Sequence, residues 1–135
     1  SSSAASDVYK RQMFNTAKKD LNRINNIHLL ESPLYSDKLR VAGRVDCIAE
    51  FDGELAVIDF KTSTKPKQEK WIENYFVQET AYAVMYYERC NVQVEKIVTI
   101  IAVEDGTMQI IEKTDLDYYY QLLIEYIDEF MAVLK

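Results

Sequence analysis

Residues 39–61 read LRVAGRVDCIAEFDGELAVIDFK, and this stretch decides the fold. Two segments with alternating apolar side chains flank Asp52-Gly53, a dipeptide typical of a two-residue β-hairpin turn. The pattern therefore predicts two antiparallel strands, Leu39–Phe51 and Leu55–Lys61. The second strand ends in Asp-x-Lys, so two charged groups stand where a plain strand would carry apolar ones.

The charged residues of this hairpin indicate phosphodiester chemistry. Asp46 is predicted on the polar face of the first strand, and Asp59 and Lys61 share a face of the second because they are two residues apart. Two carboxylates on neighbouring strands suit Mg²⁺, which binds one or two carboxylates together with water and substrate phosphate. Such an ion positions water and stabilises the charge that develops during phosphodiester hydrolysis. We therefore expect Asp46 and Asp59 to bind the metal, and Lys61 to orient the attacking water or stabilise charge.

Outward from the hairpin, the patterns predict an α/β (α+β) fold, a mixed sheet flanked by helices in the order α-β-β-β-α-β-β-α. Pro33 indicates that the first strand lies at an edge or carries a bulge. The expected elements outside the hairpin are helix Asn15–Ile24, strand Ile27–Tyr35, helix Glu69–Arg89, strand Val92–Val103, a turn at Asp105-Gly106, strand Met108–Glu112 and a final amphipathic helix beginning near Leu116.

The length of 135 residues suits a single domain, which we expect over residues 13–135. The small polar residues at the start predict that 1–12 is disordered or foreign to the fold, and the domain is expected to be truncated or to lack an upstream element. Hydrophobic residues make up 48% and charged residues 28%, which is typical of a globular protein. No apolar run suits a membrane span or a secretory leader. Two isolated cysteines predict a reducing, intracellular location. We expect this location to be the cytoplasm, or the cytoplasm of the host if the protein is encoded by a phage.

The net charge of −6 argues at first against a nucleic-acid partner, but binding depends on where the charge lies. Between Lys61 and Lys70 there are four lysines and a single acid, Glu69. This stretch is suited to contact a phosphate backbone. A solvated loop is an equally good interpretation of the charge alone.

The hairpin sequence resembles a known family. Gly43-Arg44-Val45-Asp46 followed by Val57-Ile58-Asp59-Phe60-Lys61-Thr62 is similar to the motifs of the PD-(D/E)XK nuclease superfamily. Gln78 and Tyr82, the only Gln-x-x-x-Tyr in the chain, resemble the RecB-like exonuclease branch. The stretch Lys61–Lys67 is similar to mitochondrial and phage-encoded exonucleases of that branch. The resemblance covers about Glu31–Val103 and implies a restriction-endonuclease-like core.

The resemblance also implies roles for individual residues. Asp46 and Asp59 would bind Mg²⁺ or Mn²⁺, with the Phe60 backbone carbonyl as a further ligand and Glu31 as a weaker candidate. Lys61 would be catalytic. The implied substrate is DNA, single-stranded or with free ends, contacted by Gln78, Tyr82, Thr62, Lys65 and Lys67. Relatives often carry a metal-binding histidine on an upstream helix, whereas the only histidine here is His28, close to the first strand.

Several alternatives stand beside these expectations. The same constellation serves structure-specific endonucleases and junction resolvases, and a degenerate nuclease fold can act as a non-catalytic nucleic-acid-binding or protein-binding module. Asp59 and Lys61 would then form an ordinary surface ion pair, and Asp46 an exposed pair with a neighbouring arginine. Gln78 would be a helix-surface amide and Tyr82 a packing residue. His28 is better interpreted as a polar strand residue than as a metal ligand. The tyrosines Tyr118–Tyr120 are better interpreted as packing residues than as a surface for base stacking.

Overall fold

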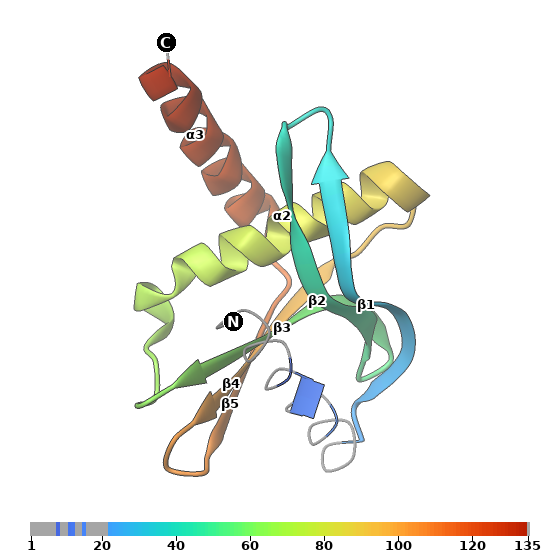
Figure 1. Ribbon diagram of the computed structural model, residues 1–135, viewed down its shortest axis with the longest axis vertical. Coiled ribbons are helices and arrows are strands. Elements are labelled where there is room, and N and C mark those ends of the chain that lie inside the picture. The colour runs from blue at the N-terminus through green and yellow to red at the C-terminus, as the bar shows by residue number, and fades with distance from the viewer. Residues whose placement is uncertain (1–7, 9–10, 13–14, 16–21, 135) are drawn as a thin grey trace.

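The computed structural model describes residues 8, 11–12, 15 and 22–134, and its centre is one five-stranded sheet (Figure 1). The strands lie in the order β1-β2-β3-β4-β5, which is also their order along the chain. All neighbours are antiparallel except β3 and β4, which run parallel and are connected through helix α2. The elements are β1 (Ile24–Ser36), β2 (Val41–Phe51), β3 (Glu54–Ser63), a 3₁₀ turn η1 (Glu69–Trp71), α2 (Glu73–Cys90), β4 (Lys96–Val103), β5 (Met108–Lys113) and α3 (Leu116–Leu134).

This mixed sheet with flanking helices confirms the predicted fold class. Within the described residues the element order also agrees, and β1 is an edge strand, as Pro33 indicated. The expected helix Asn15–Ile24 falls mostly outside the described residues, and its expected end is wrong because Ile24 already belongs to β1 and is buried. Most of the segment 1–12 also lies outside them.

The predicted hairpin between β2 and β3 has the backbone that its turn dipeptide favours. Asp52 has a φ of 54° and Gly53 a φ of 84°. Positive φ at both central residues is the type I′ geometry, whose twist matches that of the flanking strands. The turn fixes the register so that Phe51 faces Glu54 and Cys47 faces Ile58. This register places the residues at positions 46 and 59 at the same level of the sheet.

The expected long helix is divided into two parts. Residues 69–71 form η1, and α2 begins only at Glu73. Between them Ile72 has φ −121° and ψ 22°, outside the helical range, while its side chain is almost completely buried. Helical periodicity does not show such a break, because Ile72 contributes an apolar side chain to the core in either conformation. The α2 helix ends at Asn91 in the left-handed conformation, and β4 therefore starts at Lys96 rather than Val92.

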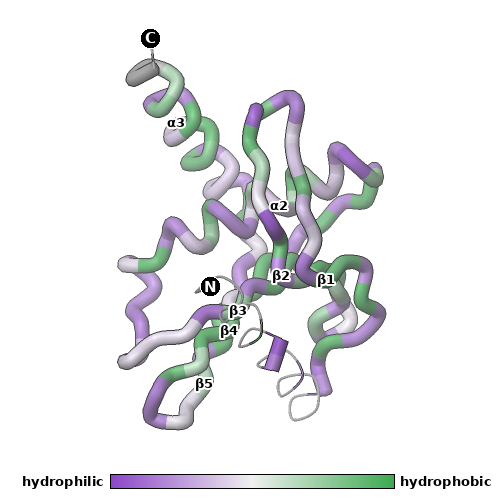
Figure 2. The backbone as a smooth tube through the Cα atoms, viewed as in Figure 1, coloured by the Kyte–Doolittle hydropathy of each residue, from purple (hydrophilic) through white to green (hydrophobic). Residues whose placement is uncertain are grey.

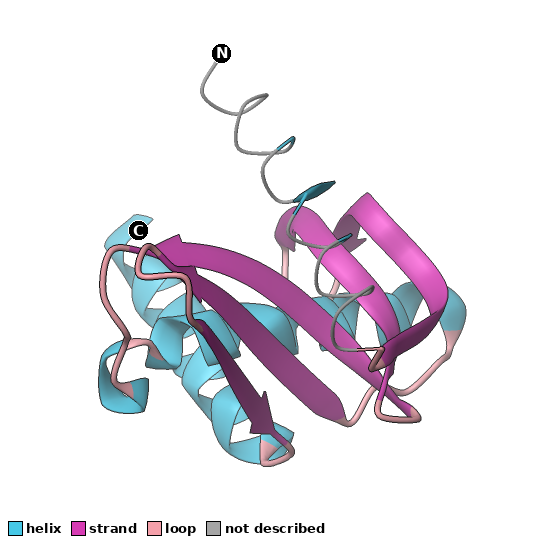
Figure 3. Ribbon diagram, turned by 90° about the horizontal axis from the view of Figure 1, so that it is seen from below, coloured by secondary structure: helices cyan, strands magenta, loops and turns pink. Residues whose placement is uncertain are grey.

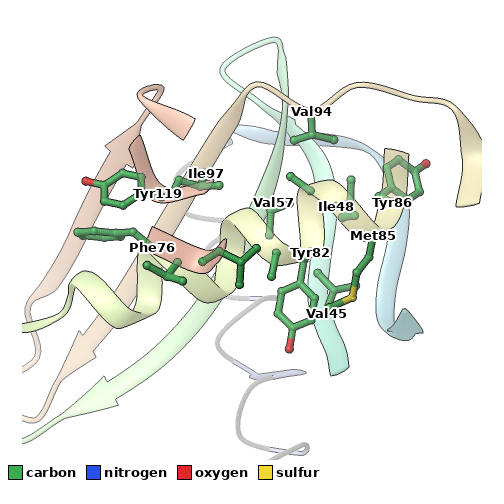
Figure 4. Packing of buried hydrophobic residues seen from close by; sticks show 14 of the residues in the cluster. Val45, Ile48, Val57, Phe76, Tyr82, Met85, Tyr86, Val94, Ile97 and Tyr119 are labelled. Carbon is green, nitrogen blue, oxygen red and sulfur yellow. The ribbon is translucent and has the colours of Figure 1, made fainter. Parts of the chain in front are cut away.

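Apolar clusters lie on both faces of the sheet. The cluster on the helix side packs Val57, Ile97 and Ile101 against residues of α2 and α3, and both helices lie on this face (Figure 3). Phe76 and Tyr119 occupy one end of this cluster, and Tyr82, Met85 and Tyr86 the other (Figure 4). The opposite face buries a second cluster, centred on Phe51, Ile58, Phe60 and Ile100. A strand buried on both faces is a rigid support for a charged group.

None of the described helices is long and apolar enough to cross a membrane.

Candidate active site

Asp46 and Asp59 lie beside each other on the helix-facing side of β2 and β3. The register that pairs Cys47 with Ile58 sets them on adjacent strands at one level. Asp46 Oδ2 accepts a hydrogen bond of 2.9 Å from the Phe60 backbone N–H. The two residues are only 8% and 5% exposed, respectively. An exposed pair with a neighbouring arginine therefore does not describe Asp46.

Lys61 completes a charged group with these carboxylates. Its Nζ lies 3.1 Å from Asp59 Oδ2, and its side chain is 24% exposed. The ammonium also lies 4.7 Å from the centre of the Tyr75 ring in the first turn of α2. The ion pair expected as an alternative is therefore present, but its carboxylate is buried, unlike that of a surface pair.

Burial sets the electrostatics of the pair. It raises the pKa of Asp59 to about 7, and the hydrogen bond and charge of Asp46 add to the effect, while Lys61 opposes it. Burial, the largest single effect, would lower the pKa of Lys61, but the charge of Asp59, its hydrogen bond to Lys61 and the charge of Asp46 act in the opposite direction, and the net effect is a raised pKa. Both pKa shifts follow from two buried carboxylates that share a single ammonium group.

Glu79 is a third acidic residue at this site, and it was not predicted from the sequence. Its side chain is completely buried on α2, and its Oε2 accepts a hydrogen bond of 2.6 Å from Thr99 Oγ1. Thr99 pairs with Asp59 in the parallel β3–β4 ladder. Burial, and then the charge of Asp59, raise the pKa of Glu79 well above its ordinary value. Glu79 lies three residues from both Phe76 and Tyr82, so helical spacing was the signal for its buried position.

Gln78 and Tyr82 meet on α2, as their spacing predicted. Gln78 Nε2 lies 3.3 Å from the Tyr82 hydroxyl. Burial, and then the charge of Asp59, raise the pKa of Tyr82. The Tyr82 ring packs on β2 at Gly43, where an added Cβ would lie 2.8 Å from ring and hydroxyl atoms. The Gly-x-x-Asp sequence therefore has a steric basis, since the glycine admits the tyrosine next to the strand that carries Asp46.

The lysine-rich stretch leaves the sheet at the end of β3 and is held in place by β5. Gln109 bonds the backbone of Lys67 twice, accepting from its N–H at 2.7 Å and donating to its carbonyl at 3.0 Å. Ser63 Oγ donates a bond of 2.5 Å to the Lys65 carbonyl. The side chains of Thr62, Lys65 and Lys67 are exposed. The stretch is thus an ordered turn that presents cationic groups to solvent.

Glu31 and His28 occupy β1. Leu30 pairs with Cys47 and Ser32 with Val45, so Glu31 lies at the level of Asp46. Glu31 has a φ of 46°, its Oε2 accepts a bond of 2.6 Å from Arg11, and its buried Oε1 has no hydrogen-bond partner among the described residues. His28 Nδ1 lies 2.9 Å from the Tyr86 hydroxyl, consistent with a polar strand position.

The tyrosines at the start of α3 differ among themselves. Tyr119 is buried against Phe76, with ring centres 5.4 Å apart, which confirms packing at that position. Tyr118 is exposed, and its hydroxyl donates to Glu73 at 3.3 Å.

The candidate ligands suit a hard divalent cation, although they are few. In the part of the chain that the structure describes, no three His, Cys, Asp or Glu side chains cluster closely enough to hold a metal ion. The chain therefore offers the two adjacent carboxylates of Asp46 and Asp59, whose burial side by side raises the pKa of Asp59. Two carboxylates, with water and a substrate phosphate in the remaining positions, match the coordination that Mg²⁺ prefers.

Comparison with known proteins places this geometry in context. A model of the PD-(D/E)XK nuclease superfamily matches residues 5–122. The mitochondrial genome maintenance exonuclease 1 of Mus musculus is 37% identical over 92 residues, which is 64% of this chain and 27% of that protein. The Homo sapiens protein of the same name is 35% identical over 92 residues, covering 64% of this chain and 26% of that protein. The chain thus spans about a quarter of the length of these relatives.

A solved structure shows the same fold. The crystal structure of a proposed exonuclease from Eubacterium rectale superposes with a TM-score of 0.58 over 90% of this chain and 50% of that one. The sequence identity is only 12%, so the likeness concerns the fold alone.

Proposed function

The chain belongs to the PD-(D/E)XK nuclease superfamily, and on that premise we propose that it hydrolyses DNA phosphodiester bonds with a divalent metal ion. The observation that carries the proposal is the convergence of Asp46, Asp59 and Lys61 on one buried patch of the sheet. A plain structural strand gains nothing from burying two carboxylates side by side, because each disfavours the charge of the other.

Mg²⁺ or Mn²⁺ is the proposed cofactor, held by Asp46, Asp59 and the Phe60 backbone carbonyl. Bound there, a divalent ion would polarise the scissile phosphate and stabilise negative charge on it. Glu31, at the level of Asp46 on the edge strand, is proposed as a further ligand. Its present partner is Arg11, so this role requires that ion pair to open.

The remaining side chains act on water and substrate. Lys61 pairs with Asp59, and we assign its ammonium to orienting the attacking water or stabilising charge on the phosphate. The Gln78 amide lies next to the Tyr82 hydroxyl, whose pKa is raised in part by the charges of Asp59 and Asp46, and we assign both residues to substrate binding. Thr62, Lys65 and Lys67 are assigned to phosphate contacts because phosphate contacts position a strand without reading its sequence.

We propose that cleavage starts from single strands or free ends. The name of the two relatives above, an exonuclease, supports this choice over endonuclease action. The alternative of a non-catalytic binding module is disfavoured because the carboxylate pair and the lysine are all present.

The test is cleavage of matched linear and circular single-stranded DNA, with Mg²⁺, with Mn²⁺ and with EDTA, by the wild type and by Asp59→Asn. Metal-dependent degradation of linear DNA alone, absent from the variant, is the expected result. Cutting of circles would assign the chain to endonucleases. Intact DNA under every condition would reject the enzymatic function.

A further inference from the structure

Trp71 is the most exposed large aromatic residue among those that the structure describes, at 67% of its full accessible surface. It lies in η1, directly after the lysine-rich stretch and directly before the buried Ile72. Because two thirds of its surface faces solvent, the core gains little from a tryptophan there. An ordered, exposed indole is instead typical of a surface that binds a flat partner.

The backbone around Trp71 is fixed, although its side chain is not buried. The Trp71 N–H donates to the Gln68 carbonyl at 3.0 Å, and the Ile72 N–H donates to the Glu69 carbonyl at 3.1 Å. Glu69 in turn pairs with Lys113 on β5 at 2.8 Å. The turn is therefore tied to the sheet on one side and to the core on the other, which lowers the entropic cost when the indole binds a partner.

The charge around the indole is positive in a chain whose net charge is −6. The Lys70 ammonium lies 5.5 Å from the centre of the Trp71 ring, and Lys65 and Lys67 precede it on the same ordered turn. The stretch between β3 and α2 is strongly hydrophilic (Figure 2). An aromatic platform beside cations is the combination that binds single-stranded nucleic acid, since bases stack on the ring and phosphates meet the lysines.

The platform also adjoins the candidate active site. Trp71 is four residues before Tyr75, whose ring centre lies 4.7 Å from the Lys61 ammonium, and the stretch that carries Trp71 connects the end of β3 to the start of α2. We therefore expect a strand whose phosphate reaches Lys61 to bring a neighbouring base within reach of the indole. In a duplex that base would remain stacked on its neighbours and would not reach the ring.

We propose that Trp71, together with Lys70, forms a stacking subsite for one unpaired base of the substrate strand. The proposal rests on the proposed function, and it makes unpaired DNA the preferred substrate class of the site.

Trp71 is the only tryptophan in the chain, so its emission reports on the subsite directly. Short single-stranded oligothymidylates, titrated in EDTA to prevent cleavage, should quench this emission. A duplex of the same length should quench it much less. Trp71→Leu should weaken binding of the single strand about 5- to 150-fold, the range expected when one base–aromatic stack is removed, and Trp71→Phe should retain most of the affinity.

An abasic scan makes the test specific. Each base of the oligonucleotide is removed in turn, and binding to the wild type and to Trp71→Leu is measured by anisotropy. One position should weaken wild-type binding while having no effect on the variant, because the variant cannot form the stack in the first place. If the variant binds every oligonucleotide like the wild type, or if duplex and single strand quench equally, the subsite is rejected.

The outcome is independent of the cleavage assay. Cleavage of linear DNA with normal binding by Trp71→Leu would reject the subsite alone. Quenching and a positive abasic scan without cleavage in Mg²⁺ or Mn²⁺ would support the subsite and reject the nuclease function.

Discussion

Gly43 and Tyr82 approach so closely that a Cβ atom at position 43 would lie 2.8 Å from both Cε1 and the hydroxyl oxygen of the tyrosine. The contact joins β2, which carries Asp46, to α2, which carries Gln78 and Glu79. It therefore sets the distance between the helix and the carboxylates of the sheet.

Gly43→Ala should destabilise the fold by about 1–3 kcal/mol, because the tyrosine ring must shift out of a packed site. Chemical denaturation of the single variants and of Gly43→Ala/Tyr82→Ala forms a double-mutant cycle. The alanine at position 43 should lower the free energy of unfolding far less when Tyr82 is also replaced by alanine. Equal decreases in stability in both backgrounds would show that the contact does not limit this position.

Asp59 should make the metal-free protein less stable as the pH rises. In the folded state its pKa is about 7, above the ordinary value of 3.8, so the folded state binds this proton more tightly than the unfolded chain. Stability from this group is greatest below pH 3.8, declines as the pH rises, and levels off above about pH 7. The total decline is on the order of 4 kcal/mol.

Urea denaturation in EDTA, from about pH 4 to about pH 8, should be compared for the wild type and Asp59→Asn. Other carboxylates, such as Asp52 and Glu88, have lowered pKa values and produce the opposite trend in both proteins. The difference between the two curves reports the charge of Asp59 together with its effect on Glu79, and the variant should gain relative stability toward high pH. A constant difference across the range would contradict the assignment.

Ca²⁺ should raise the melting temperature, and Asp46→Asn should remove most of the rise. An ion at about 100 times its dissociation constant contributes roughly 2.7 kcal/mol, or about 10 °C for a domain of this size. Differential scanning fluorimetry with and without Ca²⁺ measures this. Asparagine keeps an oxygen that can accept the hydrogen bond from the Phe60 N–H. The comparison of the wild type with Asp46→Asn therefore tests the negative charge of Asp46. Glu54→Gln, an exposed change on β3, is the control and should keep the full shift.

The lysines that follow β3 should contribute affinity for DNA without sequence preference. Changing Lys65, Lys67 and Lys70 to glutamine should weaken binding of single strands. It should also reduce the slope of log affinity against log salt by about 0.7 for each phosphate that the variant no longer neutralises. Lys38→Gln, at an exposed position in the β1–β2 turn, should leave the slope unchanged. A triple variant with the wild-type slope would show that these side chains are only solvated.

The sequence was sufficient for the β2–β3 hairpin and for the carboxylates it carries. A two-residue turn with positive φ fixes register, and register alone sets Asp46 beside Asp59. These are local consequences of side-chain alternation and turn geometry, which a single sequence contains.

What the sequence did not show depends on contacts between distant segments. The burial of Glu79 requires Thr99, which lies twenty residues further on, and the break at Ile72 depends on how the core accepts that side chain. The pairing of Glu31 with Arg11 is likewise a long-range contact. Periodicity predicts which face of an element is buried, but not which polar group another element will place against it.

The parallel pairing of β3 with β4 has a consequence for the order of folding. β1, β2 and β3 form a meander of local hairpins, so contacts that are local in sequence are enough to bring Asp46 and Asp59 together. The β3–β4 ladder forms only after the chain has crossed over through α2, a non-local and therefore slower event. We therefore expect the carboxylates to lose most of their water in this later step. Whatever neutralises them, whether a proton or a cation, is then expected to accelerate the docking of α2, so the chemistry of the site would also control how fast the fold is completed.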